Sequence, residues 1–155
     1  MSNIKKRYRL YCIVGFLIYM AALVYYTVFA ESLGRQPGLS GGIREYNLEL
    51  FSEIKRFWHS RRSRPELFWS NLIGNMLAFV PFGFLLPQLF KNIKNVFRVA
   101  AAALLMSLFI ESAQYMLNAG IFDVDDLLLN TLGAVMGCFL LKAVRRRWRR
   151  RNTHT

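Results

Sequence analysis

The sequence is poor in the residues that build metal and redox sites, with two cysteines and two histidines in 155 positions. Cys12 and Cys138 lie in apolar stretches without the spacing of a metal or redox pair, so we interpret them as small packing residues. His59 and His154 stand alone and indicate no metal site. A glycine-rich phosphate loop, a nucleophile elbow and internal repeats are also missing. The sequence therefore predicts no metal and no cofactor, and it favours a protein that is not an enzyme.

Acidic residues are also scarce, at nine against 21 lysines and arginines, which gives a formal net charge of +12. The chain is nevertheless 54% hydrophobic and has a positive mean hydropathy of +0.24. Its charges fall in blocks that are separated by apolar runs. A charge at the centre of a membrane helix costs about 2.5–3.5 kcal/mol on insertion scales. This segregation predicts a membrane protein and argues against a soluble domain.

Four apolar stretches have the length of membrane spans, at residues 10–29, 72–90, 99–117 and 127–144. About 20 residues of helix cross the hydrocarbon core, and the fourth stretch reaches that length because Lys142 can extend toward the headgroups. The first stretch is longer than the apolar part of a typical signal peptide, so we interpret it as a membrane anchor. The sequence predicts an all-α membrane protein of four transmembrane helices, forming a single domain over residues 1–155.

Basic residues indicate the orientation of these spans. Fourteen of the 21 lysines and arginines lie in the N-terminal tail, in the loop after the second span, and in the C-terminal tail together with Lys142 just before it. The remaining seven lie in the loop of residues 31–71, and the loop of residues 118–126 has none. This bias predicts that both chain ends lie in the cytoplasm and that the loops 31–71 and 118–126 lie outside.

The basic cytoplasmic tail, residues 145–155, carries six arginines between Arg145 and Arg151, interrupted by Trp148. Such a run can bind nucleic acid, but this one directly follows a membrane span. There, each basic residue gains about 1 kcal/mol from anionic headgroups, and tryptophan favours the interface. We therefore expect membrane lipids, and no nucleic acid, as partners of this tail.

The first outer loop contains a segment with helical periodicity. Its charged residues occupy one face, and the other face is formed by Asn47, Leu50, Phe51, Ile54, Phe57 and Trp58. This pattern predicts a short amphipathic helix that lies on the outer membrane surface or packs as a lid over the bundle.

Polar residues inside the predicted spans are concentrated near the outer leaflet. Glu111 lies six residues before the outer end of the third span, a depth of about 9 Å. Asn75 and Asn130 lie about 6 Å deep in the second and fourth spans, and Gln114 shares a helix face with Glu111. Since an unpaired carboxylate facing lipid is costly, we expect these four residues to face one another in a polar pocket open to the outside.

Several of these residues also have a structural interpretation. Asn75 and Asn130 can hold helices together, at roughly 0.6–2 kcal/mol for each interhelical pair. The spacing of Gly133 and Gly137 is typical of close helix packing. Glu111 differs, because an ionisable group within a span is by default a candidate functional residue.

The acidic residues before the fourth span leave two structural alternatives open. Asp123 and Asp126 can cap the N-terminus of that helix, where negative charge suits the helix dipole. Together with Asp125 they could also hold a divalent cation, but the remaining ligands of a calcium loop are missing. Arg44, or the Arg61–Arg64 group, could supply a positive charge to Glu111 if the outer loop folds down.

Three groups of residues resemble the VanZ-like family of bacterial membrane proteins. The first runs from Arg44 through Asn47 to Phe51 and is similar to the family's Arg-x-x-Asn-Leu-x-Pro-Phe, with Leu50 in place of proline. The second comprises Asn71, Asn75, Phe79, Pro81 and Gly83. The third and most specific comprises Glu111, Gln114, Phe122, Asp123, Asp125, Asp126, Asn130 and Gly133. Many members carry an arginine shortly before the Phe-Asp pair, where this chain has Gly120 and Ile121. Whatever that arginine does in the family is therefore done by Arg44 in this chain or is absent.

The resemblance implies a multi-pass protein of the bacterial cytoplasmic membrane. It also implies a role in resistance to teicoplanin and lipoglycopeptide antibiotics, or more broadly in cell-envelope homeostasis. Together with the topology, it predicts a ligand site formed by Arg44, Asn47, Asn71, Asn75, Glu111, Gln114, Asp123, Asp126 and Asn130. We expect this site to bind a lipid, a lipid-linked cell-wall precursor or a lipoglycopeptide without catalysis.

Three other functions stay open. A membrane enzyme acting on a lipid-linked precursor would use Glu111 or an aspartate as general acid or base, although no nucleophile is evident. A small transporter subunit would use the intramembrane carboxyl group, but four short spans without repeats would have to oligomerise to form a complete path. The chain could also be a structural subunit of an oligomer.

Overall fold

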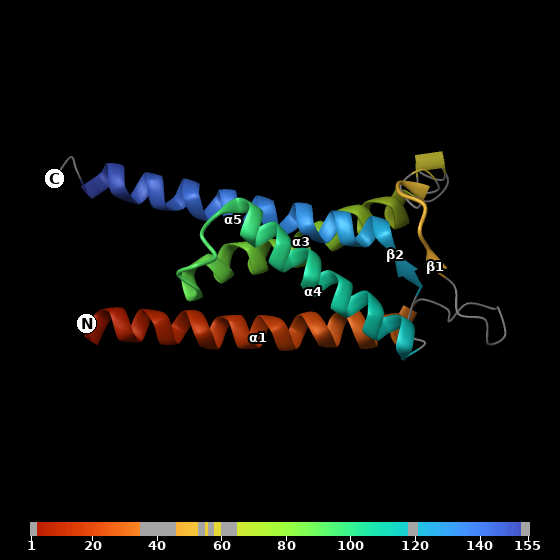
Figure 1. Cartoon of the computed structure of the whole chain (residues 1–155), viewed down its shortest axis with the longest axis horizontal. Coiled ribbons are helices and arrows are strands. Elements are labelled where there is room, and N and C mark those ends of the chain that lie inside the picture. The colour runs from red at the N-terminus through yellow and green to blue at the C-terminus, as the bar shows by residue number, and fades with distance from the viewer. Residues whose placement is uncertain are drawn as a thin grey trace.

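The computed structural model describes residues 3–34, 46–52, 55, 58–59, 65–117 and 121–152. Within these ranges the helices are α1 (Asn3–Gly34), α3 (Pro65–Leu89), α4 (Val96–Met116) and α5 (Val124–Asn152). Two short strands, β1 (Tyr46–Asn47) and β2 (Phe122–Asp123), pair in parallel. Both chain ends lie at one end of the helices, which we call the terminal end, and the strand pair lies at the other, the loop end (Figure 1).

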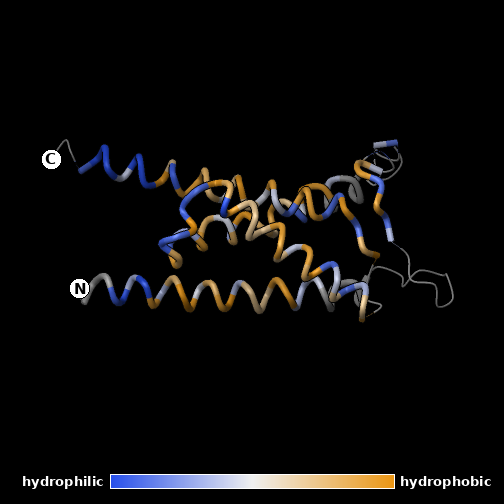
Figure 2. Tube along the Cα trace, viewed as in Figure 1, coloured by the Kyte–Doolittle hydropathy of each residue, from blue (hydrophilic) through white to orange (hydrophobic). Residues whose placement is uncertain are grey.

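Each of the four helices is long and apolar enough to cross a membrane. Apolar residues occupy the middle of the helices, and the C-terminal part of α5 is hydrophilic (Figure 2). The expected all-α fold with four membrane-spanning helices is therefore confirmed. The orientation with both ends in the cytoplasm stays a prediction, and it agrees with the position of both ends on one side of the bundle.

Helix α5 extends further than the predicted span of residues 127–144. It begins at Val124 and continues through the arginine run to Asn152. Arginine has a high helix propensity, and positive charge in the last turns suits the helix dipole. Most of the predicted basic tail is thus a continuation of the fourth spanning helix rather than a separate segment.

Helices α3 and α5 pack backbone against backbone. A Cβ atom added at Gly133 would lie 2.0 Å from the carbonyl oxygen of Met76, and one at Gly137 would lie 2.0 Å from that of Val80. From the other side, a Cβ atom at Gly83 would lie 1.7 Å from the carbonyl oxygen of Ala134. Lipid is as apolar as the side chains, so membrane helices associate through close contacts of this kind. The packing interpretation of the Gly133 and Gly137 spacing is confirmed.

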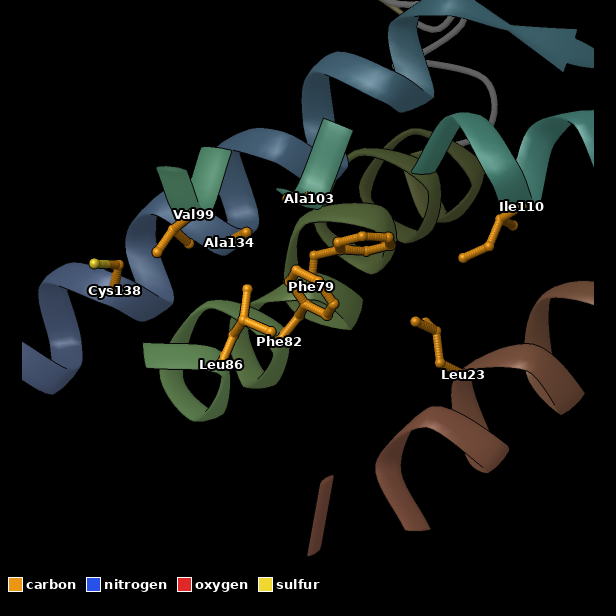
Figure 3. Close-up of a cluster of buried hydrophobic side chains, with 9 residues drawn as sticks. All are labelled: Leu23, Phe79, Phe82, Leu86, Val99, Ala103, Ile110, Ala134 and Cys138. Atoms are coloured by element: carbon orange, nitrogen blue, oxygen red, sulfur yellow. The ribbon is translucent and has the colours of Figure 1, made fainter. Parts of the chain in front are cut away.

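The apolar core lies among all four helices. It comprises Leu23 of α1, Phe79, Phe82 and Leu86 of α3, Val99, Ala103 and Ile110 of α4, and Ala134 and Cys138 of α5 (Figure 3). The two phenylalanine rings of α3 lie 5.8 Å apart between centroids, tilted by 47°, a favourable geometry for aromatic pairs. Cys138 is buried in this core as a small apolar residue, as the sequence predicted.

Helix α1 is the least covered of the four spans, and hydrogen bonds attach it to α3. The Tyr19 hydroxyl donates to the carbonyl oxygen of Ala78 at 2.7 Å. Nearer the terminal end, the Tyr8 hydroxyl donates to the side-chain oxygen of Gln88. Such bonds between membrane helices are each worth roughly 0.6–2 kcal/mol, so α1 is positioned by polar contacts as well as by Leu23.

The predicted amphipathic helix of the first outer loop does not begin at Asn47. Asn47 lies in β1, and Phe51 has a φ of 66°, which is left-handed and interrupts any helix through it. Ser52, Lys55, Trp58 and His59 are helical. Ile54 and Phe57 lie outside the described residues, so the rest of this prediction is not tested. Pairing with β2 takes the first residues of the segment out of the helical pattern.

Candidate functional site

The polar residues singled out in the sequence gather at the loop end, where β1 and β2 pair. Tyr46 is in register with Phe122, and Asn47 with Asp123. This pairing brings the first loop against the start of α5 and the end of α4. Two loops and two helices therefore meet at Asp123, the last residue of β2 and the residue before α5.

Asp123 connects these elements through both its backbone and its side chain. Its backbone N–H donates to Oε2 of Glu111 in α4 at 3.2 Å. Its Oδ1 accepts from the backbone N–H of Asp125 at 2.8 Å, which is the geometry of a helix N-cap. Its Oδ2 accepts from the side-chain amide of Asn47 at 3.2 Å. The capping interpretation of Asp123 is thus correct, and the same carboxylate also binds the first loop.

The first loop is held at a second point by Asp125. Its Oδ1 accepts from the backbone N–H of Phe51 at 2.5 Å. Between the two attachments the chain turns, with the backbone N–H of Glu49 donating to Oδ1 of Asn47 and the Asn47 side-chain amide donating to Ser52. Asp125 is completely buried, so this carboxylate lies inside the site although the predicted ligand set did not include it.

A second contact joins α3 to α5 beside this group. The side-chain amide of Asn75 donates to Oδ1 of Asp126. Both residues are half-buried, whereas Glu111, Asp123 and Asp125 are buried. The acidic cluster, which we define as Glu111, Asp123, Asp125 and Asp126, therefore has a buried base and one accessible side formed by Asp126 with Asn75.

Two further predicted residues are directed elsewhere. Asn130 donates to the hydroxyl of Ser107 at 2.8 Å. Asn130 lies one helical turn from Asp126 in α5, and Ser107 lies one turn from Glu111 in α4, in both cases on the side of the terminal end. Gln114 donates to the backbone carbonyl of Thr27 at 2.9 Å and attaches α4 to α1. Asn130 thus extends the polar region into the bundle, and Gln114 has a structural contact with the first span. The expected pocket in which both residues face Glu111 stays a prediction.

Two residues of this region were missing from the predicted ligand set. Asp125 belongs to the family motif, but sequence alone does not show which of three neighbouring aspartates points inward. Ser107 could have been recognised, because it lies one turn from Glu111 on the same helix face. Arg44 lies outside the described residues. Asn71 lies in α3, and its side chain is also outside the described part.

The chemistry of the site is that of hydrogen-bond acceptors. Four carboxylates meet at one end of a membrane bundle, where burial of an uncompensated charge is costly. Each of them has further interactions within the protein. Among the residues that the structure describes, no group of three or more histidine, cysteine or acidic side chains is arranged to hold a metal ion. Carboxylate and amide oxygens of this kind recognise hydroxyl, amide and ammonium groups.

The fold and the site define a multi-pass helical membrane protein with a largely buried acidic cluster at the loop end of its helices. The chain belongs to the VanZ/LLP1 family, whose model matches residues 16–145. It is also 36% identical over 66 residues to Protein VanZ of Enterococcus faecium, a stretch that covers 43% of this chain and 40% of that protein. No solved structure matches the chain.

These comparisons confirm the VanZ-like resemblance and a multi-pass location in a bacterial membrane. The family match covers both loops of the site and all of the acidic cluster. The match to Protein VanZ spans less than half of that relative's length, so its activity is a basis for proposals about this chain.

Proposed function

We propose that this chain binds the polar headgroup of a lipid or of a lipid-linked wall precursor at the loop end of its bundle, facing the cell exterior and without catalysis. Such binding would lower susceptibility to teicoplanin and lipoglycopeptide antibiotics. The observation that carries the proposal is the burial of Glu111 beside Asp123, because an acid within a membrane span is expensive and marks a functional site.

The accessible residues of the site favour a ligand that donates hydrogen bonds. Asp126, Asn75 and Asn47 are half-buried, whereas the carboxylates behind them are buried. Because the cluster is rich in acceptors and negative charge, the matching groups are sugar hydroxyls, peptide amides and ammonium ions. A bare phosphate would need neighbouring arginines, of which Arg44 is the candidate from the sequence.

The polar region does not continue through the described part of the bundle. Its deepest pair is Asn130 with Ser107. Beyond them, toward the terminal end, the buried residues are apolar and include Val99, Ala134 and Cys138 (Figure 3). This arrangement supports a site that opens to one membrane surface rather than a transport path through a single chain.

The exterior position rests on two supports. The loop end lies opposite both chain ends, which carry most of the basic residues. Glycopeptide antibiotics act at the outer surface, where lipid-linked wall precursors are exposed. A headgroup site on that side would be placed to change how much antibiotic reaches its target.

The test is teicoplanin susceptibility in a sensitive Gram-positive host that expresses the chain. Wild type should raise the inhibitory concentration, and Glu111→Gln should abolish the increase while its membrane level, measured by immunoblot, stays the same. Glu49→Gln is the matched control, because it makes the same chemical change at an exposed side chain. Equal protection by wild type and Glu111→Gln would reject the proposal.

A further inference from the structure

The first-loop segment Tyr46–Ser52 is bound to the protein through two polar groups and exposes its apolar side chains. Its Asn47 side chain and its Phe51 backbone N–H are directed to Asp123 and Asp125. Its apolar side chains Tyr46, Leu48, Leu50 and Phe51 are all exposed, with Tyr46 and Leu48 each at 63% of their full accessibility. The segment therefore turns the Asn47 amide and the Phe51 N–H toward the protein, whereas its apolar side chains and the Glu49 carboxyl group between them are exposed.

The backbone explains this arrangement. Alternate residues of a strand point to opposite faces, so the pairing of Asn47 with Asp123 directs Tyr46 and Leu48 outward. The turn that follows is closed by the backbone N–H of Ser52 donating to the carbonyl oxygen of Glu49 at 3.2 Å. The left-handed conformation of Phe51 lets its N–H reach Asp125 while its ring remains exposed.

Other apolar residues at the loop end are exposed as well. Met116 and Leu117 at the loop end of α4 are exposed, and so is Ile121, the residue before β2. Trp58 in the first loop and Trp69 near the start of α3 are exposed as well. Aromatic side chains at the end of a span are typical of the zone where headgroups meet acyl chains.

We propose that the segment Tyr46–Ser52 inserts its apolar side chains into the lipid leaflet at the loop end, where it lies in the plane of the membrane interface. Phospholipid is the partner that this surface fits, because exposed apolar residues also end the membrane-length helix α4 beside it and the Asn47 and Phe51 polar contacts are directed to the bundle. Insertion places the acidic cluster at headgroup depth. It does not depend on which ligand the cluster binds.

Depth-dependent fluorescence quenching tests the insertion. An environment-sensitive dye is attached to Leu48→Cys or Leu50→Cys in the full chain lacking Cys12 and Cys138, reconstituted in phosphatidylcholine–phosphatidylglycerol vesicles. Leu105→Cys, on the exposed face of α4, is the lipid control, and Asn92→Cys, in the exposed turn before α4, is the water control. Labels at positions 48 and 50 should be quenched several-fold more by a spin-labelled lipid than by iodide, as at position 105. Iodide quenching equal to that at position 92 would overturn the proposal and indicate exposure to water or to a soluble partner.

A second measurement uses the unmodified chain, in case a cysteine variant does not fold. A photoactivatable phospholipid in the same vesicles should form adducts with the tryptic peptide of residues 45–55, which trypsin releases between Arg44 and Lys55. Adducts confined to peptides from the four spans would contradict insertion. Neither the quenching nor the crosslinking experiment measures antibiotic susceptibility. The results of both are therefore independent of the proposed resistance function.

Discussion

The backbone N–H of Phe51 donates to Oδ1 of Asp125 at 2.5 Å, although the two residues are 74 positions apart in the sequence. The acceptor is completely buried at the first turn of α5, and the donor belongs to a residue in a left-handed conformation. One hydrogen bond thus holds the first loop onto the fourth spanning helix, directly beside the capping residue Asp123.

Asp125→Ala should destabilise the protein. The change removes the acceptor of the Phe51 N–H, and a typical intramolecular hydrogen bond contributes about 0.5–1.5 kcal/mol. Thermal unfolding in detergent, followed by a thiol-reactive dye that reaches the buried Cys138, should show a lower Tm. Asp125→Asn keeps an acceptor oxygen and should lose less. A Tm for Asp125→Ala equal to that of wild type would show that the bond is not needed to hold the loop.

Phe51→Gly should be more stable than Phe51→Ala. Both variants remove the exposed ring, so their difference reports the backbone. At a φ of 66° alanine retains a Cβ penalty that glycine avoids, and the expected gap is about 1 kcal/mol. The same thermal unfolding assay measures it. If alanine proves equal or better, Phe51 does not keep its left-handed conformation in the variants.

Gly137→Ala should separate α3 from α5. The new Cβ atom would lie 2.0 Å from the carbonyl oxygen of Val80 and 2.9 Å from the backbone nitrogen of Phe84. Overpacking of this kind typically costs about 1–3 kcal/mol, which a lower Tm would show. Gly15→Ala is the control, because nothing lies within 4 Å of its added Cβ atom. Similar stability of the two variants would contradict the backbone packing of α3 on α5.

Cysteine labelling should place the loop end outside the cell. In a chain lacking Cys12 and Cys138, an impermeant maleimide added to intact cells should label Gly120→Cys. It should label Asn152→Cys, at the end of α5, only after the cells are permeabilised. This outcome is expected because most basic residues lie at the terminal end. Labelling of position 152 alone in intact cells would reverse the orientation and place the acidic cluster in the cytoplasm.

Local sequence patterns were sufficient to predict the spans. Apolar runs separated by charges have few alternatives in a bilayer, because a helix satisfies all of its backbone hydrogen bonds within one segment. The first outer loop was less predictable. The spacing of Asn47, Leu50 and Phe51 fits one face of a helix, but it also suits a strand followed by a turn. Pairing with Phe122 and Asp123 decides between the two, and the partner strand lies too far along the chain for periodicity to detect it.

For the site, sequence reasoning located the polar residues at one end of the spans but could not assign their partners. Glu111 accepts from the backbone N–H of Asp123, a contact that the spans alone do not predict. Gln114, on the same helix face as Glu111, instead bonds to Thr27 of α1. That contact depends on the rotation of α4 against its neighbours, and a helical wheel does not contain this information.

The sequence by itself determined that this chain has four segments long and apolar enough to cross a membrane and carries polar residues near the ends of three of them. The tertiary structure decided which of those residues meet. Charge and hydropathy act on each segment separately, so they can be read along the chain. The bonds from Asn47 to Asp123 and from Phe51 to Asp125 join residues more than 70 positions apart. They form only because close packing of α3 on α5 and pairing of β1 with β2 set the register between distant segments.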